Sequence, residues 1–135
     1  MKPRLSLSLL GCLFSVAAAQ AETAHDFLNR FEGEARASAP AFAASAARGE
    51  KFFHAASAKD WRCSTCHTDN PAAVGKHATT SKPIEPLAPA VNAARFARTD
   101  KVDKWFKRNC NDVLERACTS AEKADLIAYL ITVKS

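Results

Sequence analysis

Two cysteines and a histidine in the middle of the chain have the spacing that most clearly predicts chemistry. Cys63, Cys66 and His67 stand in the pentapeptide Cys-Ser-Thr-Cys-His, which is the attachment signature of a c-type haem. Thiols three residues apart reach the two vinyl groups on one edge of a porphyrin. The histidine that follows then lies under the ring and supplies the proximal iron nitrogen. The motif predicts one covalent haem c.

Other uses of a Cys-x-x-Cys pair agree less well with the rest of the chain. A zinc site needs further ligands at short spacing, whereas Cys110 and Cys118 are distant and have seven residues between them. A thioredoxin-like redox pair would open a helix in a βαβ unit, and the chain shows no strand pattern. A disulfide between Cys63 and Cys66 would close a strained ring and leave His67 without a role.

The N-terminal segment has the composition of a cleaved export signal. Lys2 and Arg4 precede an apolar run over residues 5–19, and Ala19-Gln20-Ala21 is a small-x-small cleavage site. The run is too short to span a bilayer. An acylated lipoprotein is the alternative, because Leu9-Leu10-Gly11-Cys12 resembles an acylation site, although the apolar run continues past the cysteine.

These observations divide the chain into a signal peptide at 1–21 and a monohaem domain at 22–135, and they predict a periplasmic protein. The whole chain has 135 residues and a net charge of +5, and removing the signal lowers that charge further. A nucleic-acid partner is therefore not expected. The mature protein is expected to be soluble and monomeric.

The rest of the pattern predicts an all-α fold of helices and loops. Helices are expected after four capping residues, over about 23–38, 45–57, 99–108 and 119–133, the last with a Thr119/Glu122 capping box. The proline-rich segment between Thr68 and Pro89 is expected to be a loop. The arrangement resembles a small class I-type cytochrome c with an extra N-terminal helix. Gly49 and Phe53 would then cross Tyr129.

The distal iron ligand is not a methionine, because Met1 is the only one in the chain. The candidates are three histidines, a lysine, a weaker oxygen donor or no ligand at all. His54 lies on the helix that leads into the haem motif, and His25 lies far upstream. His77, in the loop, is the best histidine for a bis-histidine site, although a lone loop histidine is more often solvated.

A helical stripe provides a further distal candidate. Val102, Trp105, Phe106 and Asn109 share one face at i, i+3, i+4 and i+7. We expect Trp105 and Phe106 to pack on the haem, and Asn109 to be a polar residue at the buried end of the stripe. The spacing leaves open whether Asn109 is a ligand or a helix C-cap.

The two cysteines that the haem does not use are Cys110 and Cys118. A disulfide between them would clamp the backbone beside Asn109 to the start of the last helix, or simply staple an exported protein.

Residues 105–130 resemble the sphaeroides haem protein (SHP) family of oxygen-binding monohaem cytochromes c, through Trp105-Phe-Lys-Arg-Asn109-Cys110 and Cys118-Thr-Ser-Ala-Glu. The loop segments 68–75 and 82–89 resemble the related cytochrome c″, and the resemblance runs from about residue 46 to 133. It implies the disulfide Cys110–Cys118. It also implies a sixth ligand at Asn109, where cytochrome c″ has histidine.

The ligand chemistry agrees with the oxygen-binding branch. An amide oxygen is a hard donor that suits Fe(III) better than Fe(II), so reduction should weaken its bond. The resemblance implies that the asparagine detaches on reduction and that oxygen, nitric oxide or carbon monoxide binds. It also implies a redox partner such as a dihaem cytochrome c, and docking of the soluble protein at a membrane cytochrome is the alternative. Pro86 and Leu87 are expected to orient and cover His67.

Three function classes follow from this reasoning. The first is a gas-binding electron acceptor, and the second is a plain electron carrier with His77 as permanent sixth ligand. An enzyme, such as a peroxidase or nitric oxide dioxygenase, is the weakest because no distal His, Arg or carboxylate constellation is visible in the sequence. The basic residues Lys101, Lys104 and Arg108 on the ligand-bearing helix are expected either to dock the redox partner or to form a solvated face.

Overall fold

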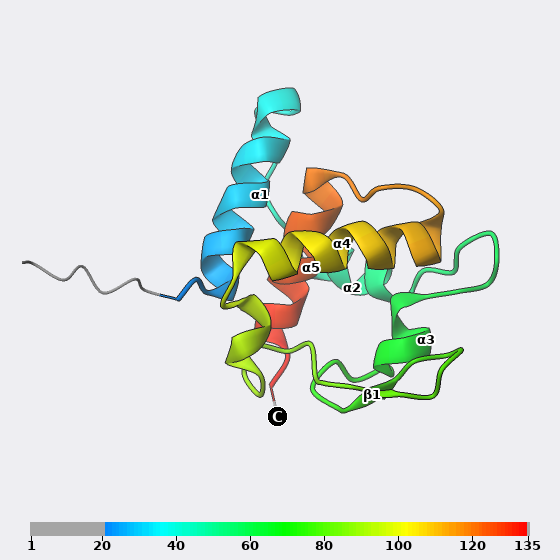
Figure 1. Cartoon of the computed structure of the whole chain (residues 1–135). Coiled ribbons are helices and arrows are strands. Elements are labelled where there is room, and N and C mark those ends of the chain that lie inside the picture. The colour runs from blue at the N-terminus through cyan, green and yellow to red at the C-terminus, as the bar shows by residue number, and fades with distance from the viewer. Residues whose placement is uncertain (1–20, 135) are drawn as a thin grey trace, which may run out of the picture.

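The structure is a computed structural model that describes residues 21–134, so the expected signal peptide lies outside the described residues except for Ala21. Figure 1 shows its elements, which are α1 (Ala24–Ser38), α2 (Ala46–His54), α3 (Cys63–His67), β1 (Gly75–Lys76), β2 (Pro83–Ile84), the 3₁₀ helix η1 (Ala93–Phe96), α4 (Thr99–Leu114) and α5 (Ser120–Thr132). The predicted all-α cytochrome architecture is confirmed. No helix in the described range is long and apolar enough to cross a membrane.

The loop expected between Thr68 and Pro89 contains a short ribbon that the sequence did not predict. β1 pairs antiparallel with β2, with Gly75 opposite Ile84 and Lys76 opposite Pro83. Pro83 carries no N–H, which is tolerated because this ribbon has only two strands and two open edges.

The extra N-terminal helix, α1, is present and begins as expected. Thr23 and Asp26 form a reciprocal capping box at its start. Its buried face packs on α5 and places Phe27 6.1 Å from Phe96 and Phe31 5.4 Å from Phe106, measured between ring centroids. Because Phe96 belongs to η1 and Phe106 to α4, α1 packs against three helices, which are α5, η1 and α4.

The crossing of α2 and α5 is the centre of the fold, as the sequence predicted. A Cβ atom built at Gly49 would lie 1.9 Å from the backbone oxygen of Asp125, so only glycine allows the two helices to approach this closely. Phe53 is fully buried and its ring lies 5.8 Å from that of Tyr129. The buried Asp125 carboxylate accepts hydrogen bonds from the Ser45 backbone N–H at 2.7 Å and from the Arg48 guanidinium.

Two helices have different ends from those expected. α2 stops at His54 rather than near Ser57, because Ser57 instead closes a turn in which its N–H donates to the Trp61 carbonyl at 2.8 Å. α4 continues past Arg108 to Leu114, where Glu115 ends it in a left-handed conformation with φ 58°. The second difference bears directly on the functional site.

Candidate haem site

A cavity of about 750 Å³ lies between α4 on one side and α3 with the β1–β2 ribbon on the other (Figure 1). This volume falls within the range of cofactor pockets. Its apolar lining comes from α2, η1, α4, α5 and the loop before η1. Its polar lining includes the haem motif and both candidate distal ligands, His77 and Asn109. The main lining residues are Phe53, Leu87, Phe96, Val102, Trp105, Phe106 and Leu130, with Cys63, Cys66, His67, His77, Arg95 and Asn109.

The haem motif forms a helix of its own at one wall of this cavity. Cys63 and Cys66 are one helical turn apart on α3 and neither is in a disulfide. The Thr65 hydroxyl accepts the Arg62 N–H at 3.1 Å and caps the helix start. Both thiols and His67 therefore face the same cavity from a five-residue helix.

The backbone after His67 turns sharply, and a glycine allows the ribbon to close against it. Thr68 has φ 60°, which is unusual for a β-branched residue, and its hydroxyl binds both the backbone N–H and the carbonyl of Asn70. A Cβ atom at Gly75 would lie 2.2 Å from the Cys66 carbonyl oxygen. The sequence reasoning did not single out Gly75, although an isolated glycine beside a strand signals such close approach.

Burial favours the neutral forms of the motif's side chains. It lowers the pKa of His67 to about 4, with a further contribution from the positive charge of Arg95. It also raises the pKa of the Cys63 thiol to about 11. A neutral imidazole keeps a nitrogen lone pair for a metal at pH 7, so the environment of His67 suits an iron ligand.

Asn109 lies on α4, at the wall of the cavity opposite α3. The C-cap interpretation is wrong, because α4 continues for five residues beyond Asn109 and Glu115 is the cap. The expected burial is also wrong in part. Val102 is buried and Trp105 and Phe106 are partly buried, but Asn109 is exposed and borders the cavity.

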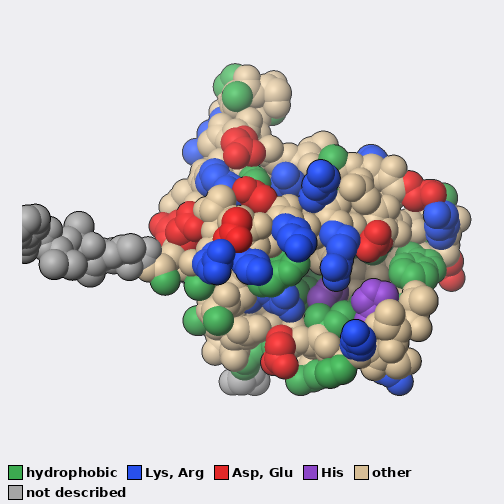
Figure 2. Space-filling model, in the orientation of Figure 1, with side chains coloured by type: hydrophobic (Ala, Val, Ile, Leu, Met, Phe, Trp, Pro, Cys, Tyr) green, Lys and Arg blue, Asp and Glu red, His purple; other side chains and the backbone are tan. Residues whose placement is uncertain are grey.

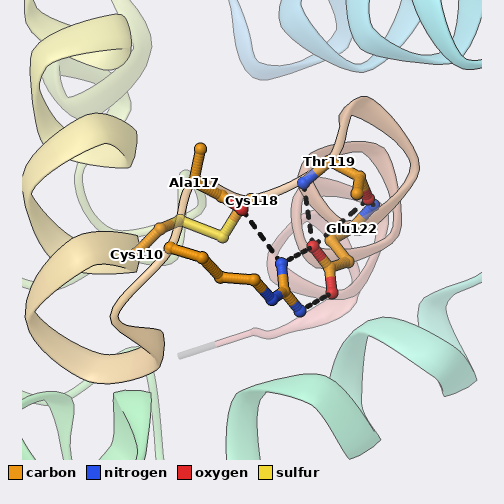
Figure 3. Close-up of a disulfide and its surroundings, with 6 residues drawn as sticks. Cys110, Ala117, Cys118, Thr119 and Glu122 are labelled. Atoms are coloured by element: carbon orange, nitrogen blue, oxygen red, sulfur yellow. Dashed lines mark hydrogen bonds and ion pairs between the residues drawn. A yellow bond between two sulfur atoms is a disulfide. The ribbon is translucent and has the colours of Figure 1, made fainter.

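The disulfide implied by the family resemblance is present and anchors the helix that carries Asn109. Cys110 and Cys118 are bonded, with Cα atoms 5.6 Å apart (Figure 3). Cys118 directly precedes Thr119, which with Glu122 forms the predicted capping box of α5. Arg116 completes the junction by donating to Glu122 and to the carbonyl of Ala117. The backbone beside Asn109 is thus tied to the start of α5.

Of the two residues expected to cover His67, only one contributes to the cavity. Leu87 lines it, and its N–H donates to the carbonyl of the buried Pro71 at 2.9 Å. Pro86 is not part of the lining, and its carbonyl accepts the Asn92 side-chain amide at 3.0 Å. The Pro86 carbonyl thus serves the turn leading to η1, and the support of His67 by Pro86 stays a prediction.

The three other histidines differ in their relation to the cavity. His77 lines it, and its Nδ1 accepts the N–H groups of Thr79 and Thr80, both at 3.2 Å. His54 lies 3.5 Å from the Asp69 carboxylate, and His25 is exposed near the start of α1.

Three charged residues lie at the cavity although the sequence reasoning did not place them there. Arg95, Arg108 and Asp112 all border it, although the sequence showed no such constellation near the distal position. Arg95 comes from η1, an element without a clear sequence signal. Asp112 is brought to the rim because α4 is longer than expected, whereas Arg108 is the last residue of the expected helix.

The residues present fit a covalent haem. The cavity holds two unbonded thiols, a neutral imidazole and an apolar lining. The buried Nε of Arg95 has no hydrogen-bond partner in the described structure, as expected of a donor that faces a polar group of a cofactor. Cys63 and Cys66 would hold the porphyrin and His67 its iron, with Trp105 and Leu87 packed on it.

Comparisons with known proteins agree with this assignment. Residues 39–130 match a family described as a domain of unknown function, DUF1924. The chain is 41% identical to cytochrome c″ of Methylophilus methylotrophus over 98% of its own length and 96% of that protein. It is also 47% identical to the cytochrome c-type protein SHP of Cereibacter sphaeroides, over about half of each.

Solved structures show the same relationship in three dimensions. Oxidised cytochrome c″ from M. methylotrophus matches with a TM-score of 0.76 and 39% identity, over 83% of this chain and 95% of that one. A solution structure of the same protein, described as giving insights into the structural basis of haem-ligand detachment, matches with a TM-score of 0.71, 40% identity and coverage of 81% and 92%. Oxidised SHP, described as an oxygen-binding cytochrome c, matches with a TM-score of 0.69, 36% identity and coverage of 82% and 96%. The chain is therefore a cytochrome with one covalent haem c, and it belongs to the DUF1924 family and to the family of cytochrome c″ and SHP.

Proposed function

We propose that this protein is an exported, periplasmic electron acceptor in which Asn109 is a redox-switched distal ligand. The haem supplies a one-electron iron couple and a position for a diatomic gas. In the oxidised protein Asn109 would bind the ferric iron through its amide oxygen. Reduction would weaken that bond, so that Asn109 would release the iron and oxygen or nitric oxide could bind in its place.

The observation that carries this proposal is the place of Asn109 on α4. It lies across the cavity from the haem motif and beside the Cys110–Cys118 disulfide. Asparagine is a poor residue for a helix interior, and the structure removes the capping role that would otherwise explain it. Because the disulfide tethers the neighbouring backbone, the amide can leave the iron by side-chain rotation and remain close enough to return.

The two relatives support the two halves of the proposal separately. SHP is described as oxygen-binding, and the solution structure of cytochrome c″ is described in terms of haem-ligand detachment. Both have the fold of this chain over most of its length. A hard amide donor gives a physical reason for detachment in the reduced state, because Fe(II) is the softer ion.

A second candidate function is plain electron transfer with His77 as a permanent ligand, since His77 also lines the cavity. Its position is less suitable. His77 follows β1 directly, on the ribbon that packs against Cys66, and the N–H of Ala78 points to the Cys66 Sγ at 3.4 Å. His77 therefore comes from the same wall as the proximal motif, whereas a distal ligand must come from the opposite wall.

We also propose that the redox partner docks on the outer face of α4, through an acidic surface of its own. Lys101, Lys104 and Lys107 are exposed, as is Arg108 at the rim of the cavity, and none of the four is in an ion pair within residues 21–134. The acidic residues at the start of the same helix are neutralised, since Asp103 pairs with Arg30 and Asp100 with Arg98. Figure 2 shows Lys and Arg side chains gathered over the part of the surface where α4 lies in Figure 1, beside a hollow in which histidine is visible.

Optical spectra of oxidised and dithionite-reduced variants test the ligand assignment. Asn109→Ala should keep the haem attached but make the ferric iron high-spin and open to small ligands. Asn109→His should give low-spin iron and slower oxygen binding. His77→Ala, which removes another cavity-lining side chain, should leave both spectra unchanged. If Asn109→Ala stays low-spin while His77→Ala becomes high-spin, the gas-binding proposal is wrong and electron transfer takes its place.

A further inference from the structure

Arg95 is a positively charged residue that lines the haem cavity and is not one of the residues assigned to the iron or to haem attachment. It comes from η1 and lines the cavity together with His67 and Trp105. Its guanidinium carbon lies 4.5 Å from the centre of the Trp105 ring, within the range of a cation–π contact. The side chain is therefore held in place against α4, the helix that carries Asn109.

The hydrogen bonding of this guanidinium is incomplete. One terminal nitrogen donates to the Glu85 carbonyl oxygen at 2.7 Å, whereas the buried Nε has no partner. No carboxylate forms an ion pair with Arg95 anywhere in residues 21–134. A guanidinium has five N–H donors, and its burial is costly without a paired counter-charge. The Glu85 carboxylate acts on Arg95 electrostatically but forms no ion pair with it in the described structure, so the guanidinium keeps donors free for a further anion.

Other arginines of the chain show what is missing at Arg95. Arg48 pairs with Asp125 at 2.7 Å, Arg98 with Asp100 at 2.9 Å and Arg116 with Glu122 at 2.6 Å. Each of these three arginine side chains is exposed to solvent, and each has a carboxylate partner. Burial also lowers the pKa of Arg95, and the negative charge of Glu85 offsets part of that shift.

The haem carries carboxylates at the edge of the porphyrin away from its vinyl groups. Cys63 and Cys66 hold the vinyl edge at α3. In Figure 1, η1 lies at the far end of the cavity region from α3, in the yellow-green segment that precedes α4. A porphyrin held by Cys63 and Cys66 would carry its carboxylates on the edge away from α3, and Arg95 is a cavity-lining cation on an element away from α3.

We propose that Arg95 binds a haem propionate through its Nε and terminal nitrogens, and that its positive charge raises the reduction potential of the iron. A carboxylate is the planar acceptor that a guanidinium binds with two parallel hydrogen bonds. A fixed cation beside the haem disfavours the more positive ferric state. This inference rests on the covalent haem and is independent of whether Asn109 detaches.

Midpoint potentials at neutral pH test the inference. Arg95→Gln removes the charge, and Arg95→Lys keeps it. Arg98→Gln is the matched control, because it removes the charge of an exposed arginine three residues later in the chain that does not line the cavity. We expect Arg95→Gln to favour the ferric state by about tenfold, which is about 59 mV for one electron. Arg95→Lys should shift the potential much less, and Arg98→Gln should leave it close to that of the unmodified protein.

Resonance Raman spectra provide a readout that a merely structural role would not change. The propionate bending band should move in Arg95→Gln and stay in place in Arg98→Gln. Equal potentials and an unmoved band in Arg95→Gln would show that Arg95 only supports the fold through Glu85 and Trp105. The same shift is expected in an Asn109→Ala background, so a wrong ligand assignment and a wrong Arg95 assignment produce different results. If Arg95→Gln does not fold, the band position in Arg95→Lys decides, because an ammonium replaces the two-pronged contact with one.

Discussion

Removing the Cys110–Cys118 disulfide should weaken both the fold and the hold of Asn109 on the iron. The suitable change is the double variant Cys110→Ala with Cys118→Ala, which leaves no unpaired thiol. Cys110 directly follows Asn109 in α4, and Cys118 directly precedes the capping residue of α5. The variant therefore frees the last turn of the ligand-bearing helix while leaving the haem motif unchanged.

The size of the effect follows from the short loop that the bond closes. A sequence separation of 8 gives a nine-residue loop, for which the chain-entropy relation predicts a loss of about 2.5 kcal/mol in the free energy of unfolding. Both cysteines are buried, so lost packing adds to this figure. At about 4 °C per kcal/mol for a domain of this size, the melting temperature should fall by about 10 °C.

Thermal unfolding followed by circular dichroism, with the ferric spin state read from absorption, measures both consequences. The control is Arg116→Gln, which removes the adjacent ion pair to Glu122 but keeps the bond. An exposed pair of this kind contributes less than about 1 kcal/mol. We expect a larger high-spin ferric fraction in the disulfide variant alone. A melting temperature within 3 °C of the control, together with an unchanged spin state, would refute the inference that the disulfide stabilises the fold and holds Asn109 at the iron.

Three further predictions concern the helix crossing, the docking face and maturation. Gly49→Ala should destabilise the fold by about 3 kcal/mol or more in denaturant titration, because its methyl group would lie 1.9 Å from a backbone oxygen of α5; an effect below 1 kcal/mol would contradict that crossing. Reversing Lys101 and Lys104 to Glu should slow reduction by an acidic donor at low salt, unlike Lys51→Glu on α2, and equal rates would leave these lysines as a solvated face. The exported protein should have the mass of the chain from about Glu22 plus one haem, with no free thiol after denaturation, and two reactive thiols would contradict the disulfide.

Much of the local structure could be predicted from the sequence because it depends on neighbours along the chain. The helix cap at Thr23 and the capping box of Thr119 with Glu122 involve residues three apart and appear where the sequence predicts them, and Thr23 also forms a box with Asp26. The spacing of Cys63, Cys66 and His67 is likewise a property of a single helical turn. The family resemblance added Asn109, which the spacing alone could not distinguish from a cap.

The remaining features depend on contacts between distant segments, which no local pattern records. α4 extends to Leu114 because the disulfide and packing continue it past the point where its apolar stripe ends, and this removed the capping role of Asn109. Pro86 and Leu87 are adjacent, yet only the leucine lines the cavity, while the Pro86 carbonyl accepts a hydrogen bond from the distant Asn92 side chain.

The sequence by itself determined the cofactor, its covalent attachment and the proximal ligand, because those follow from residue types at a spacing that only a short helix needs to satisfy. Only the tertiary structure decided which residues share the cavity with them. Arg95 is the clearest case. Nothing in its sequence context distinguishes it from the paired arginines, and its missing counter-charge becomes visible only once η1, α4 and the segment at Glu85 are packed together. Burial of a charge is a property of the assembled fold, and so is the function that we infer from it.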